Sequence, residues 1–248
     1  MTRAINFIPQ RLILSPGRVN LLGEHVDYNQ GIVLPAAINR YVTLKAQPLD
    51  ESIITLTALD LSSSVQFHLD DLEKKMDVNG QLLPGWALYP AAVAWVLKSR
   101  GFQVTGVQAE YTSDVPIGSG LSSSAAVEVA FAILWQSLGG WSLNRLEIAQ
   151  VCQQAENEYV GVHCGLMDQF AVACGVEGHA LRFDTRSLDY QPVPLPNNSA
   201  IIIADSGVRR SLTNSAYNDR REACQQAVAI IQRYQPEITS LRDVSDEQ

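Results

Sequence analysis

The chain has 248 residues, of which 46% are hydrophobic and 18% charged, and this balance is typical of a folded globular protein rather than a disordered, collagenous or coiled-coil one. Its formal net charge of −8, from 26 acidic and 18 basic residues, argues against a protein that binds nucleic acid or an anionic membrane through a basic surface. At about 150 residues per domain, the length allows one large domain or two small ones.

The cysteines and the N-terminus indicate a reduced compartment. Four cysteines (Cys152, Cys164, Cys174 and Cys224) form neither a CxxC pair nor a zinc spacing. The first ten residues lack the apolar core of a signal peptide, and no segment has the roughly 18 unbroken apolar residues of a membrane span. We therefore expect a cytoplasmic protein without a membrane anchor.

Hydrophobic periodicity predicts strands mainly early and helices mainly later in the chain. In chain order we expect strands at 11–14, 41–46, 53–58 and 65–69, a helix at 91–99, a strand at 104–111, helices at 122–138, 144–159 and 165–174, strands at 180–183 and 200–204, and a helix at 215–234. This order favours an α+β domain over a regular βαβ series.

Local signals mark several boundaries. Asn144 followed by Glu147 is typical of a capping box, and Gly139-Gly140 is expected to end the helix before it. Residues 191–198 contain three prolines and are expected to be a linker. The linker would separate a body of about 190 residues from a tail of roughly 50, which is too short for a core of its own.

Residues 114–126 are the most informative stretch for chemistry. Two glycines are followed by three serines at which a helix is expected to begin. Glycines let the backbone approach an anion, and a helix start supplies free N–H groups and a favourable dipole. The stretch matches neither the GxxxxGK[ST] phosphate loop nor the GxSxG nucleophile elbow. The alternative is a Gly/Ser turn with a serine N-cap.

Polar side chains are also concentrated in residues 15–31 and around Glu156 and Asp168, and each group has a structural and a functional interpretation. Residues 15–31 are dense in hydrogen-bonding groups, which suits a polyhydroxylated ligand, although a solvated polar loop is the alternative. Asp168 lies near the start of a helix, where a carboxylate is either a dipole partner or a functional group aimed into a cleft. Glu156 lies near the end of the preceding helix, where the dipole disfavours a negative charge, so it needs another reason to be there.

Together these segments resemble the galactokinases of the GHMP small-molecule kinase family. Residues 18–28 look like the galactokinase signature, departing mainly at Val26, where threonine is usual. Four more segments resemble family motifs: 116–125 its ATP loop, 164–169 the stretch with its catalytic aspartate, 215–221 a stretch with a sugar-contacting tyrosine, and 84–89 the aromatics around adenine.

The resemblance implies a fold, an activity and partners. We expect a GHMP-kinase N-terminal domain, of the ribosomal protein S5 domain 2-like fold, at residues 1–195. The incomplete start of the C-terminal α+β domain is expected at 196–248, because the chain stops before the family's last glycine-rich motif. The implied activity is ATP-dependent phosphorylation of the anomeric hydroxyl of D-galactose to galactose 1-phosphate, in the Leloir pathway. Its implied partners are galactose, ATP and Mg²⁺, without nucleic acid or membrane, in a full-length monomer.

The resemblance also assigns roles, position by position. Asp168 would be the catalytic base and Arg18 its neighbour. The sugar would be contacted by Glu24, His25, Asp27, Gly165 and Tyr217. The phosphates would be cradled by Gly118, Ser119, Gly120, Leu121, Ser122, Ser123 and Ser124. Magnesium would be held by Ser124 and Glu156, and adenine would be flanked by Trp86 and Tyr89.

Several alternatives stay open at this point. Pro90, directly after Tyr89, is expected to break a helix that continues from Trp86 unless it occupies the first turn. One alternative substrate is a related sugar such as N-acetylgalactosamine or arabinose, and another interpretation of the chain is a non-catalytic relative or an inactive fragment. Asp168 either removes the proton of the reacting hydroxyl or mainly orients that hydroxyl. An apolar face left by a missing C-terminal part should promote association.

Overall fold

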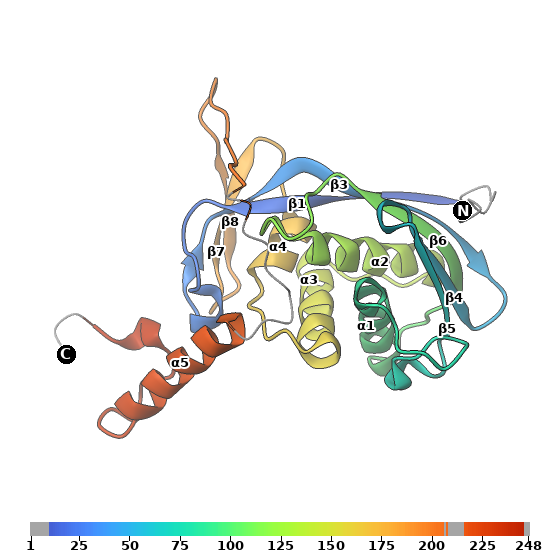
Figure 1. Ribbon diagram of the computed structural model, residues 1–248. Coiled ribbons are helices and arrows are strands. Elements are labelled where there is room, and N and C mark those ends of the chain that lie inside the picture. The colour runs from blue at the N-terminus through green and yellow to red at the C-terminus, as the bar shows by residue number, and fades with distance from the viewer. Residues whose placement is uncertain (1–9, 206, 208–215, 246–248) are drawn as a thin grey trace.

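Strand β3 (Pro35–Leu49) is the longest strand of the fold and organises the larger of two sheets. The computed structural model describes residues 10–205, 207 and 216–245 (Figure 1). The other strands are β1 (Arg11–Asn20), β2 (Ile32–Val33), β4 (Ile53–Ala58), β5 (Ser63–His68), β6 (Gly106–Ser113), β7 (His179–Asp184) and β8 (Tyr190–Pro194). The α-helices are α1 (Gly85–Ser99), α2 (Ser123–Gly139), α3 (Arg145–Gln154), α4 (Met167–Cys174) and α5 (Ala216–Ile231).

The larger sheet has the order β1-β3-β6-β4-β5. All its pairs are antiparallel except β4 and β6, which run parallel because a hairpin strand and helix α1 connect them. Side chains alternate across the sheet, so that Ile54, Leu56 and Ala58 of β4 are buried while their neighbours are half-buried. Helices α2 and α4 pack against β1 and β3, and α1 and α3 lie on the same side of the sheet (Figure 1). The result is a two-layer α+β domain, as the sequence predicted.

Helix α2 is buried along most of its length. Its alanines let neighbouring elements approach closely, and Trp135 fills the core while its indole N–H donates to the carbonyl of Thr105 at 3.1 Å. Glu128 is the one charged residue in the helix and is fully buried. A buried carboxylate in such a helix indicates a polar site at that point of the core.

The smaller sheet, β2-β7-β8, supports helix α4. Phe170 of α4 stacks on Phe183 of β7 with ring centroids 3.8 Å apart, and Val33 and Leu181 complete this second apolar cluster. This packing fixes the orientation of α4, whose first turn carries Asp168. The sheet is therefore the support of that carboxylate.

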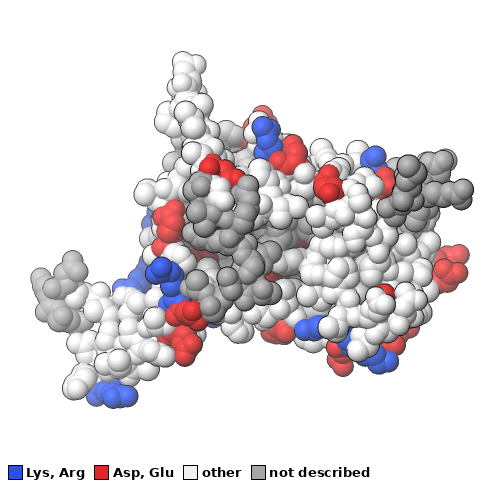
Figure 2. Space-filling view, in the orientation of Figure 1, with Lys and Arg blue, Asp and Glu red and all other residues white. Residues whose placement is uncertain are grey.

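The C-terminal segment, α5 with the short 3₁₀ helix η5 (Leu241–Asp243), extends from one end of the domain (Figure 1). On the face shown in Figure 2, acidic and basic side chains are intermixed over the described surface. Within the described residues, no helix has the length and apolar character needed to cross a membrane.

Several local predictions are confirmed. Strand 53–58 has the predicted bounds, and all five predicted helices are present, although the predicted start of the last one at Ser215 lies outside the described residues. The capping box at Asn144 and Glu147 is formed, and Gly140 ends α2 in the left-handed region with φ 70°.

Other predictions are wrong. Residues 200–204 form no strand. The predicted linker at 191–198 begins inside β8, whose prolines are tolerated because β8 is an edge strand. The predicted helix 144–159 divides into α3 and a π-helix, η4 (Ala155–Val160). Pro90 lies inside α1 and does not break it, since burial on all sides of the helix outweighs one missing hydrogen bond.

Gly106 offers a test of the sheet packing. A Cβ at this position would lie 1.9 Å from the carbonyl oxygen of Glu51, so we expect Gly106→Ala to lower the free energy of unfolding by about 2 kcal/mol or more. Gly85→Ala is the matched control, because a Cβ there meets nothing within 4 Å and should stabilise the helix by about 0.5 kcal/mol. Urea unfolding of both variants measures the difference, and equal stabilities would contradict the packing.

Candidate active site

The site is centred on Asp168, which joins three parts of the chain. Arg18, at the end of β1, donates from Nε to Oδ1 at 2.8 Å, and its Nη2 lies 2.6 Å from the same oxygen. Ser122, immediately before α2, donates its hydroxyl to Oδ2 at 2.6 Å. The carboxylate is therefore oriented by Arg18 on one oxygen and by Ser122 on the other, while 29% of its side chain stays accessible.

The loop between β6 and α2 has the geometry of an anion site. Gly118 and Gly120 have φ of 73° and 77°, and Ser122 adopts the left-handed region at φ 59°, which is costly for a residue with a Cβ. The hydroxyl of Ser122 binds Asp168 and not the helix, so no side chain caps the first turn of α2. That turn therefore presents backbone N–H groups and the positive end of the helix dipole to the site.

Arg18 also fixes this loop to the sheet. Its Nη1 donates to the carbonyl of Gly120 at 2.6 Å, and its backbone N–H donates to the carbonyl of Leu121 at 3.1 Å. Ser119 closes the tip of the loop by donating its hydroxyl to the carbonyl of Pro116 at 2.7 Å. Arg18 thus fixes the position of both the Asp168 carboxylate and the loop that faces this carboxylate.

Behind the loop lies a buried polar cluster of Glu128, Glu156 and Gln169. The side-chain amide of Gln169 donates to Glu128 Oε2 at 3.0 Å and to Glu156 Oε2 at 2.6 Å, so that it bridges the two carboxyl groups. Glu128 Oε1 and Gln169 Oε1 are buried and have no hydrogen-bond partner. An amide bridge reduces the repulsion between the carboxyl groups and fixes the orientation of Glu156.

Burial changes the acidity of this pair. Burial, and then the nearby charge of Asp168, raise the pKa of Glu156 to about 7, although hydrogen bonds from Cys164, Gln169 and Ser124 oppose the shift. Burial and the charge of Glu156 raise the pKa of Glu128 well above its usual range. Such crowding is unfavourable without a cation, so a cation that binds here would be attracted strongly.

The chemistry of these donors fits magnesium. Ser124 and Glu156 offer a hydroxyl and a carboxylate oxygen side by side, and Mg²⁺ prefers oxygen ligands. Among the described residues, no group of three or more His, Cys, Asp and Glu is arranged to hold a metal ion. Mg²⁺ usually takes one or two protein oxygens and completes its shell with water and substrate phosphates, so two donors suffice.

A second polar cluster lies around Asp27, whose carboxylate feels the charge of Asp168. Burial and the charge of Asp168 raise the pKa of Asp27 to about 6. Gly165 approaches this carboxylate so closely that a Cβ there would lie 2.0 Å from Asp27 Oδ2. The backbone N–H of Gly165 donates to the hydroxyl of Tyr217 at 3.4 Å. Asp27, Gly165 and Tyr217 are therefore brought together from three distant segments, as the predicted sugar site requires.

Three aromatic rings pack together beside this cluster. The ring of Tyr217 lies 5.6 Å from that of His25 and 5.5 Å from that of Tyr28, and His25 Nδ1 lies 2.9 Å from the Tyr28 hydroxyl. Glu24 is exposed and accepts a hydrogen bond from Asn20 Nδ2 at 3.2 Å. His25, Asp27, Gly165 and Tyr217 therefore lie together, while Glu24 contacts Asn20.

The two residues predicted to flank adenine, Trp86 and Tyr89, differ from each other in burial and in their neighbours. Trp86 is half-buried and packs edge-on against Tyr111 with centroids 6.0 Å apart. Tyr89 is only 7% exposed, and burial together with the nearby charges of Glu156 and Glu128 raises the pKa of its hydroxyl. Tyr89 thus adjoins the carboxylate pair in the core, and its contact with adenine stays a prediction.

Glu128, Gln169 and Tyr28 were not among the predicted site residues. Glu128 could have been predicted from the sequence, because a single charged residue in an apolar helix needs a partner in the core. Gln169 and Tyr28 lie directly beside Asp168 and Asp27 in the sequence, but only the three-dimensional arrangement shows what they contact.

Comparison with known proteins agrees with this geometry. The profile of the GHMP kinases N terminal domain matches residues 88–176, and the galactokinase galactose-binding signature matches residues 7–48. A galactokinase of Roseiflexus sp. (strain RS-1) is 42% identical over 240 residues, which are 97% of this chain. The chain is therefore similar to galactokinases over most of its length, and its residues 88–176 match the GHMP kinases N terminal domain.

Solved structures extend the comparison. The crystal structure of Lactococcus lactis galactokinase complexed with galactose is 32% identical, covers 95% of this chain and superposes with a TM-score of 0.83. Methanococcus jannaschii mevalonate kinase, at 20% identity and a TM-score of 0.59 over 74% of this chain, shares the fold. The chain spans 60% of the length of both the Roseiflexus and the Lactococcus galactokinases.

The acidity of Asp27 gives a prediction on stability. Its pKa rises from 3.8 to about 6 on folding, so the folded state binds the proton more tightly, and the protein loses stability as the pH rises through 6. We expect Asp27→Asn to have a higher melting temperature than the parent at pH 8. This advantage should disappear below pH 4, where both side chains are neutral. Calorimetry at the two pH values measures it, and an advantage that did not change with pH would contradict the assignment.

Proposed function

We propose that this chain is the sugar- and ATP-binding part of a galactokinase, which transfers the terminal phosphoryl group of ATP to the anomeric hydroxyl of D-galactose. The observation that carries the proposal is the position of Asp168. This carboxylate lies between the pocket of Asp27, Gly165 and Tyr217 and the anion-binding loop before α2. A group in that position faces both a sugar hydroxyl and a phosphoryl group.

In this proposal Asp168 accepts the hydrogen bond of the reacting hydroxyl. As the sugar oxygen bonds to phosphorus, the hydroxyl proton passes to the carboxylate and ADP leaves. Arg18 keeps a positive charge within 2.6 Å of Asp168, which holds the carboxylate in one orientation before the transfer. Phosphoryl transfer depends mainly on positioning and charge neutralisation, and these residues provide both.

The nucleotide would bind with its phosphates on the loop 118–124. Backbone N–H groups of the loop and of the first turn of α2 bind phosphate oxygens, and the hydroxyls of Ser123 and Ser124 add donors. Ser124 and Glu156 would hold Mg²⁺, which neutralises charge on the phosphates. Trp86, with Tyr89, is proposed to flank the adenine.

The sugar would bind between the aromatic cover and Asp27. Carboxylate oxygens of Asp27 and Glu24 accept hydrogen bonds from sugar hydroxyls, and the imidazole of His25 and the hydroxyl of Tyr217 add directional partners. The close approach of Gly165 to Asp27 leaves main chain as one wall of the pocket. Galactose is favoured as the sugar because the segment 7–48 matches the galactokinase galactose-binding signature.

We further propose that residues 1–195 form the N-terminal domain and that 196–248 begin a second one. Ile201, Ile202 and Ile203 support the boundary, since these adjacent apolar side chains are 41%, 90% and 41% exposed and an apolar run of this kind is usually covered by protein. A cytoplasmic location stays a prediction from the cysteines and the N-terminus, and a monomeric full-length protein stays a prediction from the resemblance.

The proposal is tested by coupled ADP release from the purified chain with galactose and with a panel of other sugars, including N-acetylgalactosamine and arabinose. ADP release that requires galactose supports the proposal. Faster ADP release with another sugar would mean that this other sugar, and not galactose, is the substrate. Binding of ATP and galactose by calorimetry without ADP release would show that this chain binds substrates without catalysing the reaction. Binding of neither substrate would contradict the proposal.

Asp168→Asn gives a sharper prediction. The amide cannot accept the proton, so we expect turnover to fall by at least about a hundredfold while the fold is retained. Asp71→Asn, at an exposed ion pair with Lys74, is the matched control and should leave turnover unchanged. Circular dichroism checks folding and steady-state kinetics measure turnover. Full activity of the Asp168 variant would remove this residue from the mechanism.

A further inference from the structure

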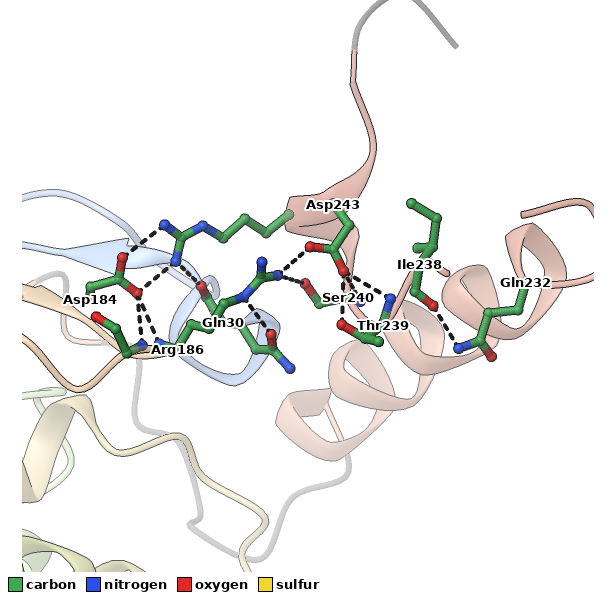
Figure 3. Close-up of polar contacts among 10 residues, drawn as sticks. Gln30, Asp184, Arg186, Gln232, Ile238, Thr239, Ser240 and Asp243 are labelled. Carbon is green, nitrogen blue, oxygen red and sulfur yellow. Dashed lines mark hydrogen bonds and ion pairs between the residues drawn. The ribbon is translucent and has the colours of Figure 1, made fainter. Parts of the chain in front are cut away.

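A network of charged side chains joins the C-terminal segment to the body of the domain. We call it the arginine clasp: Arg186 and Arg242 with Asp184 and Asp243. Figure 3 shows the network between the end of β7 and helix η5, with Gln30 at its centre. Nothing in the proposed reaction uses it directly, so it needs its own explanation.

The two arginines cross between the segments. Arg242, in η5, makes two parallel bonds to Asp184 at the end of β7, from Nη1 to Oδ1 at 2.6 Å and from Nη2 to Oδ2 at 2.8 Å. Arg186, just after β7, reaches in the other direction and donates from Nη2 to Asp243 Oδ1 at 2.5 Å and to Ser240 Oγ at 2.8 Å. Two-point contacts of this kind fix geometry, unlike an isolated surface ion pair.

Local structure holds each carboxylate in place for its arginine. Asp184 Oδ1 also accepts the backbone N–H of Arg186 at 3.0 Å, and Asp243 Oδ2 accepts those of Thr239 and Ser240 at 2.8 and 3.0 Å. The side chains of Asp184 and Asp243 are only 15% and 19% exposed. The hydrogen bond from Arg242 holds the pKa of Asp184 well below its usual range, so the pair is ionised at neutral pH.

Both arginines also hold Gln30. Arg242 Nη1 donates to the backbone carbonyl of Gln30 at 2.7 Å, and Arg186 Nε donates to its side-chain Oε1 at 2.7 Å. Gln30 has a left-handed backbone with φ 61° and ends the short helix η1 (Asp27–Asn29). The clasp therefore fixes a strained turn directly after Asp27 and Tyr28, two residues of the candidate sugar pocket.

The same C-terminal segment carries the cover of that pocket. Tyr217 of α5 packs on Tyr28, and Asn29 donates to Cys224 Sγ of α5 at 3.4 Å. Gln232 donates to the carbonyl of Ile238 at 2.7 Å, which ties α5 to the chain that leads into η5. The loop 25–30 thus lies against α5 at one end and in the clasp at the other.

We propose that the arginine clasp positions the loop 25–30 against Tyr217, so that Arg186 and Arg242 are positioning residues for sugar binding and not for nucleotide binding. The inference rests on the proposed function, because it takes this pocket as the sugar site. It assigns a role in substrate affinity to residues that do not touch the substrate.

The test compares Arg242→Met with Arg233→Met in the full chain. Methionine keeps the length of the side chain but loses the donors, and Arg233 is an exposed arginine of the same segment outside the clasp. We expect Arg242→Met to bind galactose about fivefold or more weakly by calorimetry, with ATP affinity unchanged. Arg242→Lys, which keeps the charge and loses the second donor, should fall between the two. Arg233→Met should bind both ligands like the parent.

Hydrogen exchange provides a readout that does not depend on galactose. The amides of Asn29 and Gly31, which both donate to the carbonyl of Val26, should exchange faster in Arg242→Met than in Arg233→Met. The amides of β4 in the central sheet should be unchanged, because a positioning role is local.

Each other outcome overturns a defined part of the inference. Unchanged exchange at Asn29 and Gly31 would show that the clasp does not hold the loop. Faster exchange throughout β4 would make its role one of general stability. Parent-like galactose affinity in Arg242→Met, with faster loop exchange, would refute its role in sugar binding. A parent chain that binds no galactose would overturn the proposed function, and the exchange result would still decide whether the clasp holds the loop.

Discussion

The contact between Arg18 and Asp168 is the constraint on which the site depends. Arg18 is carried by an edge strand of the large sheet, and Asp168 by a helix that the small sheet supports. Their ion pair at 2.6 Å joins these two parts of the domain, and a second bond from the same guanidinium holds the loop at Gly120. Ser122 completes the junction from the start of α2. Movement of any one of these elements would therefore misplace the carboxylate relative to both pockets.

Negative charge is concentrated around this junction. Asp27, Glu128 and Glu156 are all shielded from water near Asp168, and burial is the first cause of each raised pKa. Such an arrangement lowers the stability of the ligand-free fold at neutral pH. The arrangement fits the proposed site, which would receive hydrogen-bond donors from a sugar and a cation together with phosphates. In that proposal the net acidic charge of the whole chain does not oppose ATP binding, because only the local donors would face the phosphates.

Local patterns in the sequence predicted local structure well. The capping box at Asn144 depends on residues three apart, and β4 shows strict alternation, so both were predictable without knowledge of the fold. Strand β8 was not, because its prolines signal a linker unless one knows that it lies at a sheet edge. The apolar run at 200–204 has the composition of a strand, yet a strand needs a partner, and partners are not encoded locally. Pro90 shows that tertiary burial overrides a local helix-breaking signal.

Motifs predicted most of the candidate site for a different reason. Arg18, Asp168 and the glycine loop lie in recognisable segments, so their proximity followed from the resemblance. Glu128 and Gln169 were not predicted, because their role depends on a contact in the core between residues that are 41 positions apart in the sequence. The side-chain amide of Gln169 donates to Glu128 there at 3.0 Å. The clasp around Gln30 was not predicted either, since exposed arginines and aspartates carry no local signal that distinguishes a partner from solvent.

The contact between Gly165 and Asp27 has a consequence for how this site can change over evolutionary time. A wall made of main chain offers selection no side chain to vary, and even a methyl group there would collide with the carboxylate. If the proposed sugar site is correct, changes in sugar preference would arise at other positions, such as His25 or Tyr217, which have side chains that can be exchanged. Gly165 would then be the fixed part of the site, and the aromatic residues the part that can vary.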